Sequence, residues 1–129
     1  MIRRIKSKIN SFRSVLIKEN DKLMFAELIR ERGAKCEFCG RTQGLGTFHI
    51  LRKATYPRIR YHRANLLLAC WQPCHYTWHH DYKTARDKIE PKIKELCGED
   101  YEEKLLALNL TAPRLTMTQL NLIKMSLMQ

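Results

Sequence analysis

The chain has 129 residues, of which 44% are hydrophobic, and its 24 Lys and Arg against 13 Asp and Glu give a formal net charge of +11. This composition excludes a disordered tail, and the length predicts a single compact domain with one modest hydrophobic core. The positive charge favours a polyanionic partner, with nucleic acid as the first candidate. No stretch approaches the roughly 20 apolar residues of a membrane span, so no membrane association is expected.

The positive charge is concentrated in the first two thirds of the chain. Residues 1–35 carry ten basic and four acidic residues, and residues 36–86 carry eight and two. Residues 87–129 carry six and seven, so their predicted role is structural. We divide the domain into a basic N-terminal helical segment before residue 36, a central core over 36–90 and a C-terminal helical extension over 91–129.

The N-terminal segment has the pattern of a basic amphipathic helix, because apolar residues recur every three or four positions with Lys and Arg between them. Asn20-Asp21 is expected to interrupt it. A second helical stretch is predicted over Lys22–Arg32, and Gly33 is placed to end it. The basic residues either form a solvated helix face or contact a DNA backbone. The apolar positions are Ile2, Ile5, Ile9, Phe12 and Leu16.

Residues 36–74 lack a helical period and contain several glycines, which is typical of turns and short strands. We predict strands at Thr47–Leu51 and Ile59–Tyr61. A helix is predicted over 73–89, after which Pro91 breaks or restarts it.

The C-terminal extension is predicted to hold two last helices, with N-caps at Asp100 and Thr116. Its leucines are more numerous than one exposed face requires. They either pack on the central core or bury a partner, so the protein is expected to be a monomer or a homodimer.

Five cysteines, in a chain whose first thirty residues lack a secretory signal pattern, predict a reducing, cytoplasmic compartment. Paired cysteines there are typical of metal ligands, and two such pairs predict a four-thiolate zinc site; the alternative is four ordinary buried thiols. Cys97 is left over and is expected to be a buried apolar residue near a helix end. The second pair is more widely spaced than usual, which leaves open that His75 replaces Cys74 or Cys70. The predicted zinc ligands are Cys36, Cys39, Cys70 and Cys74.

Four polar residues lie between or just after the cysteine pairs. His75 and His79 stand four residues apart, so on a helix they share one face and could share one cation; the alternative is an incidental pair. His49 follows Phe48 in a predicted strand, where alternation puts the two side chains on opposite faces. Asn65 by itself could be an ordinary turn residue.

Taken together, the order Cys-x2-Cys, His49, Asn65, Cys-x3-Cys-His75-x3-His79 resembles the HNH nuclease superfamily over residues 36–82. More narrowly, Phe48-His49-Ile50, the run Ile59–Leu66 and the second cysteine pair look like the NinG-like phage recombination nucleases. This resemblance implies an α+β fold with a small zinc-stapled ββα-metal core flanked by N- and C-terminal helices. It also implies a phage or prophage protein in a bacterial cytoplasm.

The resemblance further implies a metal-dependent DNA endonuclease that hydrolyses phosphodiester bonds of branched or single-stranded recombination intermediates, leaving 3′-hydroxyl and 5′-phosphate ends. His49 matches the general base, and Asn65 matches the residue that orients it or approaches the metal. His75 and His79 match the ligands of a catalytic Mg²⁺, Mn²⁺, Ni²⁺ or Zn²⁺. A neutral His49 would take a proton from water while the cation stabilises the developing charge.

Phe48 departs from the commoner HNH pattern, which has Asp or His immediately before the base as a metal ligand. Phenylalanine cannot coordinate a cation. Either Asn65, His80 or Asp81 completes the catalytic site, or the chain is a non-catalytic zinc-stapled DNA-binding module.

Basic residues near the proposed site alternate in sequence with Tyr56, Tyr61 and Trp78, a mixture that suits phosphate contacts beside an open or stacked nucleotide. The alternative is that Tyr61 and Trp78 are core residues. The residues predicted to bind DNA are Arg52, Lys53, Arg58, Arg60, Arg63 and Lys83.

Overall fold

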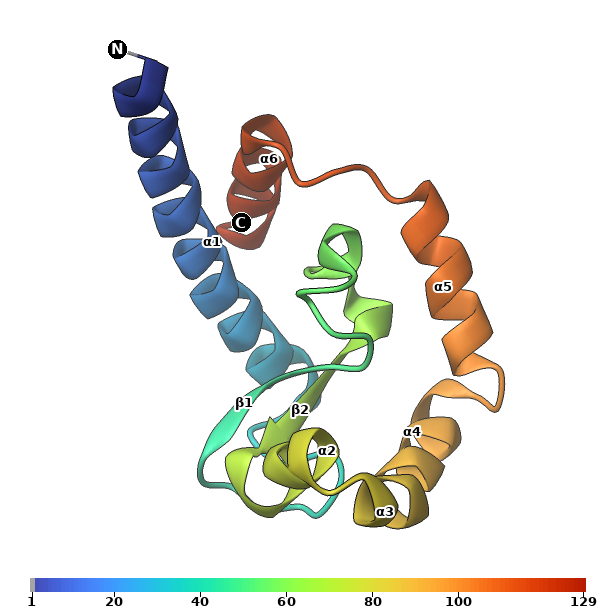
Figure 1. Ribbon diagram of the computed structural model, residues 1–129. Coiled ribbons are helices and arrows are strands. Elements are labelled where there is room, and N and C mark those ends of the chain that lie inside the picture. Colours follow the sequence, from blue (N-terminus) through green and yellow to red (C-terminus); the bar gives the residue numbers. More distant parts are fainter. Residues whose placement is uncertain (1) are drawn as a thin grey trace.

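The computed structural model describes residues 2–129 and combines helices with a small antiparallel sheet (Figure 1). The sheet has two strands, β1 (Leu45–His49) and β2 (Leu66–Cys70), with Phe48 opposite Leu67. The protein is therefore a small α+β fold, as the sequence predicts at that level.

Helices lie on both sides of the sheet. The helices are α1 (Ile2–Arg32), α2 (Tyr76–His80), α3 (Tyr82–Thr84), α4 (Glu90–Cys97), α5 (Tyr101–Thr111) and α6 (Met117–Leu127). Short helical turns are η1 (Pro57–Ile59), η2 (Arg63–Asn65), η3 (Trp71–His75) and η4 (Ala85–Ile89). An extended segment after α5 carries the chain back, so that α6 packs beside α1 (Figure 1).

Each face of the sheet contributes to its own hydrophobic core, because successive side chains of a strand point to opposite faces. Phe48 and Leu67 face the core built with α4 and α5, whereas Leu66 and Leu68 face the core built with α1 and α6. The first core comprises Cys36, Phe48, Ile50, Ile59, Leu67, Ala69, Cys70, Cys74, Ile89, Ile93, Tyr101 and Leu105. The second comprises Leu16, Met24, Leu28, Tyr61, Leu66, Leu68 and Leu120.

Helix α1 is continuous, so the predicted interruption at Asn20-Asp21 is wrong. Asn20 is fully buried and its Nδ2 donates to the carbonyl oxygen of Leu120 in α6 at 2.9 Å. Asp21 points to the loop before β2, where it accepts from Arg60. Tertiary partners thus outweigh the weak helix propensity of both residues.

The second predicted strand is also wrong, because the segment around Ile59 forms the turn η1 and the second strand is β2. All five residues of β2 are buried. A strand that is buried on both faces has a continuous apolar sequence without polar–apolar alternation. Periodicity alone cannot distinguish such a strand from a buried helical segment.

The helix predicted over 73–89 is divided at Asp81, whose backbone (φ −131°, ψ 85°) is not helical. Its carboxylate accepts from the backbone N–H of Thr84 at 3.1 Å and so caps α3. Pro91 neither breaks nor restarts the helix as predicted, because the backbone stays helical from η4 through Glu90 into α4. Gly98 with φ of +102° ends α4. Thr116 caps α6 by accepting from the N–H of Gln119, as predicted.

The C-terminal extension contributes to both cores, through Leu105 of α5 and Leu120 of α6. Packing therefore accounts for these two leucines. Within residues 2–129, the structure contains no helix with the length and apolar character needed to cross a bilayer.

Candidate metal and nucleic-acid site

The two cysteine pairs converge into one cluster. Their four Sγ atoms all lie within 4.8 Å of one another, and Cys39 Sγ is 3.6 Å from Cys70 Sγ. A tetrahedral zinc site with Zn–S bonds of about 2.3 Å requires sulfur atoms about 3.8 Å apart. The four thiols therefore have the number, type and spacing of ligands for a metal ion such as zinc. His75 is not part of this cluster.

Backbone contacts bring the first pair to the second. The turn from Cys36 to Gly40 is closed by the Gly40 N–H, which donates to the Cys36 carbonyl at 2.9 Å, and Gly40 has φ of +81°. Glu37 then docks on β2: its N–H donates to the Leu68 carbonyl at 2.8 Å, and its carboxylate accepts from the Leu68 N–H at 2.6 Å. The turn that carries the first cysteine pair is thereby fixed to β2, the strand that ends at Cys70.

The thiols respond differently to this environment. Burial opposes ionisation of Cys36, but hydrogen bonds from the backbones of Cys70, Cys39 and Phe38 outweigh it and lower its pKa to about 7. Burial raises the pKa of Cys70 and of Cys74. Cys36 therefore ionises readily, whereas its neighbours resist ionisation. A bound cation would offset the repulsion between the thiolates and allow the other cysteines to ionise.

His75 and His79 form a second pair of potential ligands, on the side of the sheet that Phe48 faces. Their Nε2 atoms are 3.0 Å apart, close to the separation of about 3.0–3.4 Å expected for two imidazoles on one cation with bonds of about 2.1 Å. Burial lowers the pKa of His75 to about 4, and His79 and Lys53 add to this effect. Burial, Arg52, His80 and Lys53 lower the pKa of His79. Both imidazoles are thus neutral at pH 7.

No third His, Cys, Asp or Glu side chain completes a ligand set around this pair within residues 2–129. His80 stacks on Tyr76 at 4.5 Å between ring centroids, and the Asp81 carboxylate is engaged in capping α3. Phe48 lies against His75, with ring centroids 5.6 Å apart. A cation here would need its remaining ligands from water or from phosphate oxygens.

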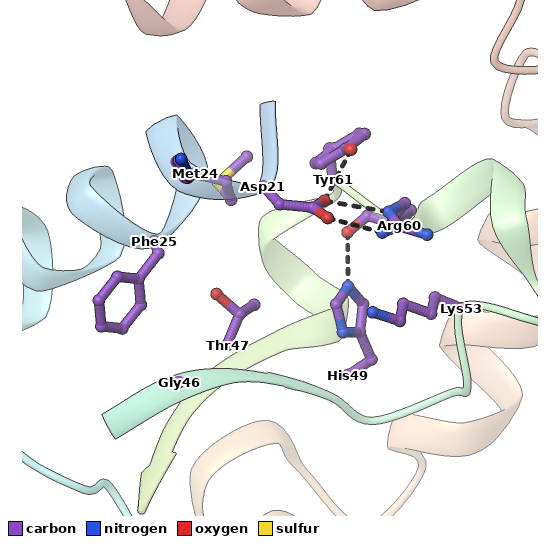
Figure 2. A pocket seen from close by; sticks show the side chains of 10 residues that line it. Asp21, Met24, Phe25, Gly46, Thr47, His49, Lys53, Arg60 and Tyr61 are labelled. Atoms are coloured by element: carbon purple, nitrogen blue, oxygen red, sulfur yellow. Dashed lines mark hydrogen bonds and ion pairs between the residues drawn. The ribbon is translucent and has the colours of Figure 1, made fainter. Parts of the chain in front are cut away.

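His49 lines a different hollow, of about 300 Å³, between β1 and α1 (Figure 2). Its Nε2 lies 3.0 Å from the carbonyl oxygen of Arg60, and donation to that oxygen leaves Nδ1 with a free lone pair. Burial is the main cause that lowers the pKa of His49 to about 4, and Lys53 contributes. Lys53 also lowers the pKa of His75, so its ammonium lies within electrostatic reach of both histidines.

The pKa of His49 predicts a pH-dependent contribution to stability. An unfolded histidine titrates near pH 6.5 and the folded one near 4, so the unfolded state binds the proton first. Stability is fully present above pH 6.5 and is lost as the pH falls toward 4. We expect the wild type to lose about 2 kcal/mol more than His49→Gln between pH 7 and 4.5, measured by urea unfolding.

Glutamine is the matched replacement because its amide can still donate to Arg60 and cannot ionise. Protonation of the cysteine cluster affects both proteins and cancels in the difference. Equal losses in the two proteins would show that His49 is not buried in its neutral form.

Asn65 is fully buried and clamps the segment that follows β1. Its Oδ1 accepts from the Leu51 N–H at 2.7 Å, and its Nδ2 donates to the Leu51 carbonyl at 3.0 Å. The backbone carbonyl of Asn65 also accepts from the Ile50 N–H at 2.9 Å. With its amide engaged by backbone on both sides, Asn65 is arranged to fix the chain beside His49 and not to bind a cation.

We expect Asn65→Ala to lower the free energy of unfolding by about 3 kcal/mol, because it leaves the N–H and carbonyl of Leu51 without partners. Asn121→Ala is the matched control, since Asn121 is an exposed asparagine of α6. Urea unfolding of both variants with zinc present measures the effect. A loss below about 0.5 kcal/mol at residue 65 would mean that the clamp contributes little.

The six basic residues predicted to bind DNA separate into two groups. Arg60 forms a bidentate pair with Asp21, at 2.7 and 3.1 Å, and Arg63 pairs with Glu31 at 3.0 Å. Both guanidinium charges are therefore already paired with carboxylates of α1. The other four form no side-chain ion pair within residues 2–129 and remain available for phosphates: Arg52, Lys53, Arg58 and Lys83.

Sequence reasoning missed Asp21 as a neighbour of the His49 hollow. Its carboxylate holds Arg60 and accepts from the Tyr61 hydroxyl at 2.8 Å, while the Arg60 carbonyl holds His49 (Figure 2). Burial and Asp21 raise the pKa of Tyr61, so it remains a hydroxyl donor. No local signal identifies Asp21, because it lies in a helix far from the motif in sequence.

Comparisons with protein-family models, curated proteins and solved structures found no match to the chain.

Proposed function

We propose that the protein is a zinc-stapled, metal-dependent DNA endonuclease of the HNH type. The observation that carries the proposal is the pair of neutral imidazoles of His75 and His79, whose Nε2 atoms are 3.0 Å apart. The pair directly follows the four-thiolate cluster in the chain, so a zinc staple would hold the start of its helix rigid. Free basic side chains nearby supply attraction for a phosphate backbone.

In this proposal His75 and His79 hold a divalent cation, which when bound stabilises the negative charge that develops on a phosphodiester undergoing hydrolysis. Arg52 and Lys53 position the phosphate, because both lower the pKa of His79 and so lie within electrostatic reach of it. His49 takes a proton from water at Nδ1, since its Nε2 is held by the Arg60 carbonyl. Asn65 fixes the backbone that connects His49 to Arg52.

A second candidate is a non-catalytic zinc-stapled DNA-binding module. The observation that favours it is the alternation of β1, which turns Phe48 toward His75 and turns His49 toward α1. The base and the cation ligands then face opposite sides of the sheet. Joint action of these histidines requires the DNA phosphate to sit at the end of β1, where Lys53 lies within electrostatic reach of both.

Incubation of zinc-loaded protein with supercoiled plasmid, labelled single strands and labelled branched DNA tests the proposal. Each substrate is offered Mg²⁺, Mn²⁺, Ni²⁺ or added Zn²⁺. Cleavage that requires one of these cations and leaves 5′-phosphate ends supports the endonuclease, and preference for branched DNA supports a role in phage recombination. Tight DNA binding without cleavage in any cation supports the binding module instead.

A further inference from the structure

A second hollow, of about 430 Å³, lies between the segment after β1 and the stretch from α2 to α4. Its volume falls in the range of small-molecule sites, which is roughly 300–1,000 Å³. Aromatic, apolar and basic side chains share its lining. The aromatic residues are Tyr56, Trp78 and Tyr82, the apolar residues are Ile50, Leu51 and Ala85, and the basic residues are Arg52 and Arg86.

The aromatic rings are not engaged with one another. Trp78 has one ring contact within residues 2–129, with Phe48 at 5.5 Å, and that contact anchors it to the core. Tyr82 is 79% exposed, and the guanidinium of Arg86 lies 5.7 Å from its ring centroid. Among the described residues, Tyr56 and Tyr82 have no ring contact, and the Phe48 ring that Trp78 contacts is not part of the lining. Planar surface is therefore available to a planar ligand.

The charge of the hollow favours an anion. Arg52 has no acidic side-chain partner within residues 2–129, and the contact of Arg86 with Asp87 is long, at 3.8 Å. Glu90 is the one acidic residue in the lining, and Lys94 lies 3.8 Å from its carboxylate. Two arginines beside stacking surfaces match a ligand that combines a flat ring with phosphates.

The position of the hollow connects it to the histidine pair. Trp78 precedes His79 in α2, and Arg52 both lines the hollow and lowers the pKa of His79. A DNA strand that occupies the hollow would therefore lie beside the proposed cation site. A paired base has both faces covered by its neighbours in the duplex, so only an unpaired base could present a face to Trp78 or Tyr82.

We propose that this hollow binds an unpaired base of single-stranded DNA by stacking on Trp78 and Tyr82, with Arg52 and Arg86 on the flanking phosphates. The inference deepens the proposed function, on which it rests for the identity of the nucleic acid, by naming the structure of the substrate. The hollow selects unpaired over paired DNA without reading sequence.

Two measurements without added divalent cation test the hollow apart from any cleavage. Trp71→Phe leaves Trp78 as the single tryptophan, and Trp71 is an exposed residue outside the hollow. We expect oligothymidylate to quench the fluorescence of Trp78, whereas an abasic strand of equal length and a blunt duplex do not. We expect Tyr82→Ala to weaken oligothymidylate binding about 5- to 150-fold, the effect of losing one stacked base. Tyr76→Ala, an exposed tyrosine outside the hollow, is the matched control and leaves affinity unchanged.

Equal quenching by the blunt duplex, or equal affinity for the abasic strand, would overturn the proposal, because phosphate contacts would then explain binding. Unchanged affinity in Tyr82→Ala would overturn it as well. A protein that fails these tests but cuts plasmid keeps its endonuclease function and loses the hollow as a base site. Quenching in a protein that never cuts DNA supports the hollow while the endonuclease proposal fails.

Discussion

We expect the purified protein to contain one zinc ion per chain and Cys36→Ala to lose both the zinc and the folded core. The thiol of Cys36 lies in the four-sulfur cluster and is only 2% exposed. Structural zinc contributes about 10–16 kcal/mol of apparent binding free energy at pH 7, whereas small domains have a net stability of about 5–15 kcal/mol. The free energy lost with the zinc is therefore expected to be as large as the whole net stability of the domain, so the domain should unfold.

Together with the hydrogen bonds of Glu37 to β2, the cluster joins two parts of the chain that are 31 residues apart in sequence, from Cys39 to Cys70. One cysteine pair follows α1, and the other spans the end of β2 and the turn η3. Without the metal, the three buried thiols of Cys36, Cys70 and Cys74 would have to pack as small apolar groups around an exposed Cys39. Metal analysis and circular dichroism after chelation measure the outcome.

Cys97→Ala is the matched control for this prediction. Cys97 is partly buried and packs against the same core, but it lies outside the four-thiol cluster. We expect this variant to keep its zinc and to lose about 1 kcal/mol of stability at most, as for a small change at a partly buried site. A Cys36→Ala chain that remains folded after chelation would rule out the structural role of the metal.

We expect His49→Ala to slow DNA cleavage by about 10²- to 10⁴-fold, the usual contribution of a general base, while DNA affinity and zinc content stay at wild-type levels. The imidazole is neutral above about pH 4 and is oriented by the Arg60 carbonyl. His79→Ala should also slow cleavage, but through weaker binding of the cation. Its defect should therefore shift with cation concentration, whereas the defect of His49→Ala should not.

His62→Ala is the control for the His49 substitution, because His62 is an exposed histidine in the segment between β1 and β2. Its Nδ1 accepts from the Ala64 N–H at 3.2 Å, and its side chain has no other hydrogen bond within residues 2–129. Rates are measured on a labelled strand at saturating cation. Wild-type cleavage by His49→Ala would exclude this residue as the base, and loss of DNA affinity in the same variant would indicate a binding role instead.

The candidate metal centre shows how much local spacing reveals. A short spacing between cysteines leaves few ways to arrange the thiols, so the first pair indicates a metal knuckle from sequence alone. The spacing of the second pair left His75 open as a substitute ligand. The structure excludes His75 from the thiol cluster, because its imidazole instead faces His79. The i,i+4 relation of these two histidines also follows from helix geometry alone.

Other site properties depend on contacts between distant segments. In sequence, Asn65 has the properties of an ordinary turn residue. It becomes a buried clamp only because the segment after β1 folds against it and the backbone of Leu51 bonds its side-chain amide. Arg60 and Arg52 are alike in sequence, yet Arg60 is engaged by Asp21 from α1, whereas Arg52 has no acidic side-chain partner within residues 2–129. Composition cannot separate such residues, because the partner that neutralises one of them lies about 40 residues away.

The sequence by itself determined the two cysteine pairs that can hold a metal ion, the helical character of both ends, the N-cap of α6 and the end of α4, because each depends on residues within a few positions of one another. Only the tertiary structure decided that α1 runs through Asn20, that the second strand is Leu66–Cys70, and that His49 and His75 face opposite sides of the sheet. The physical reason is that these features are set by packing and hydrogen bonds between segments, whose free energies outweigh the local preferences that a sequence pattern records.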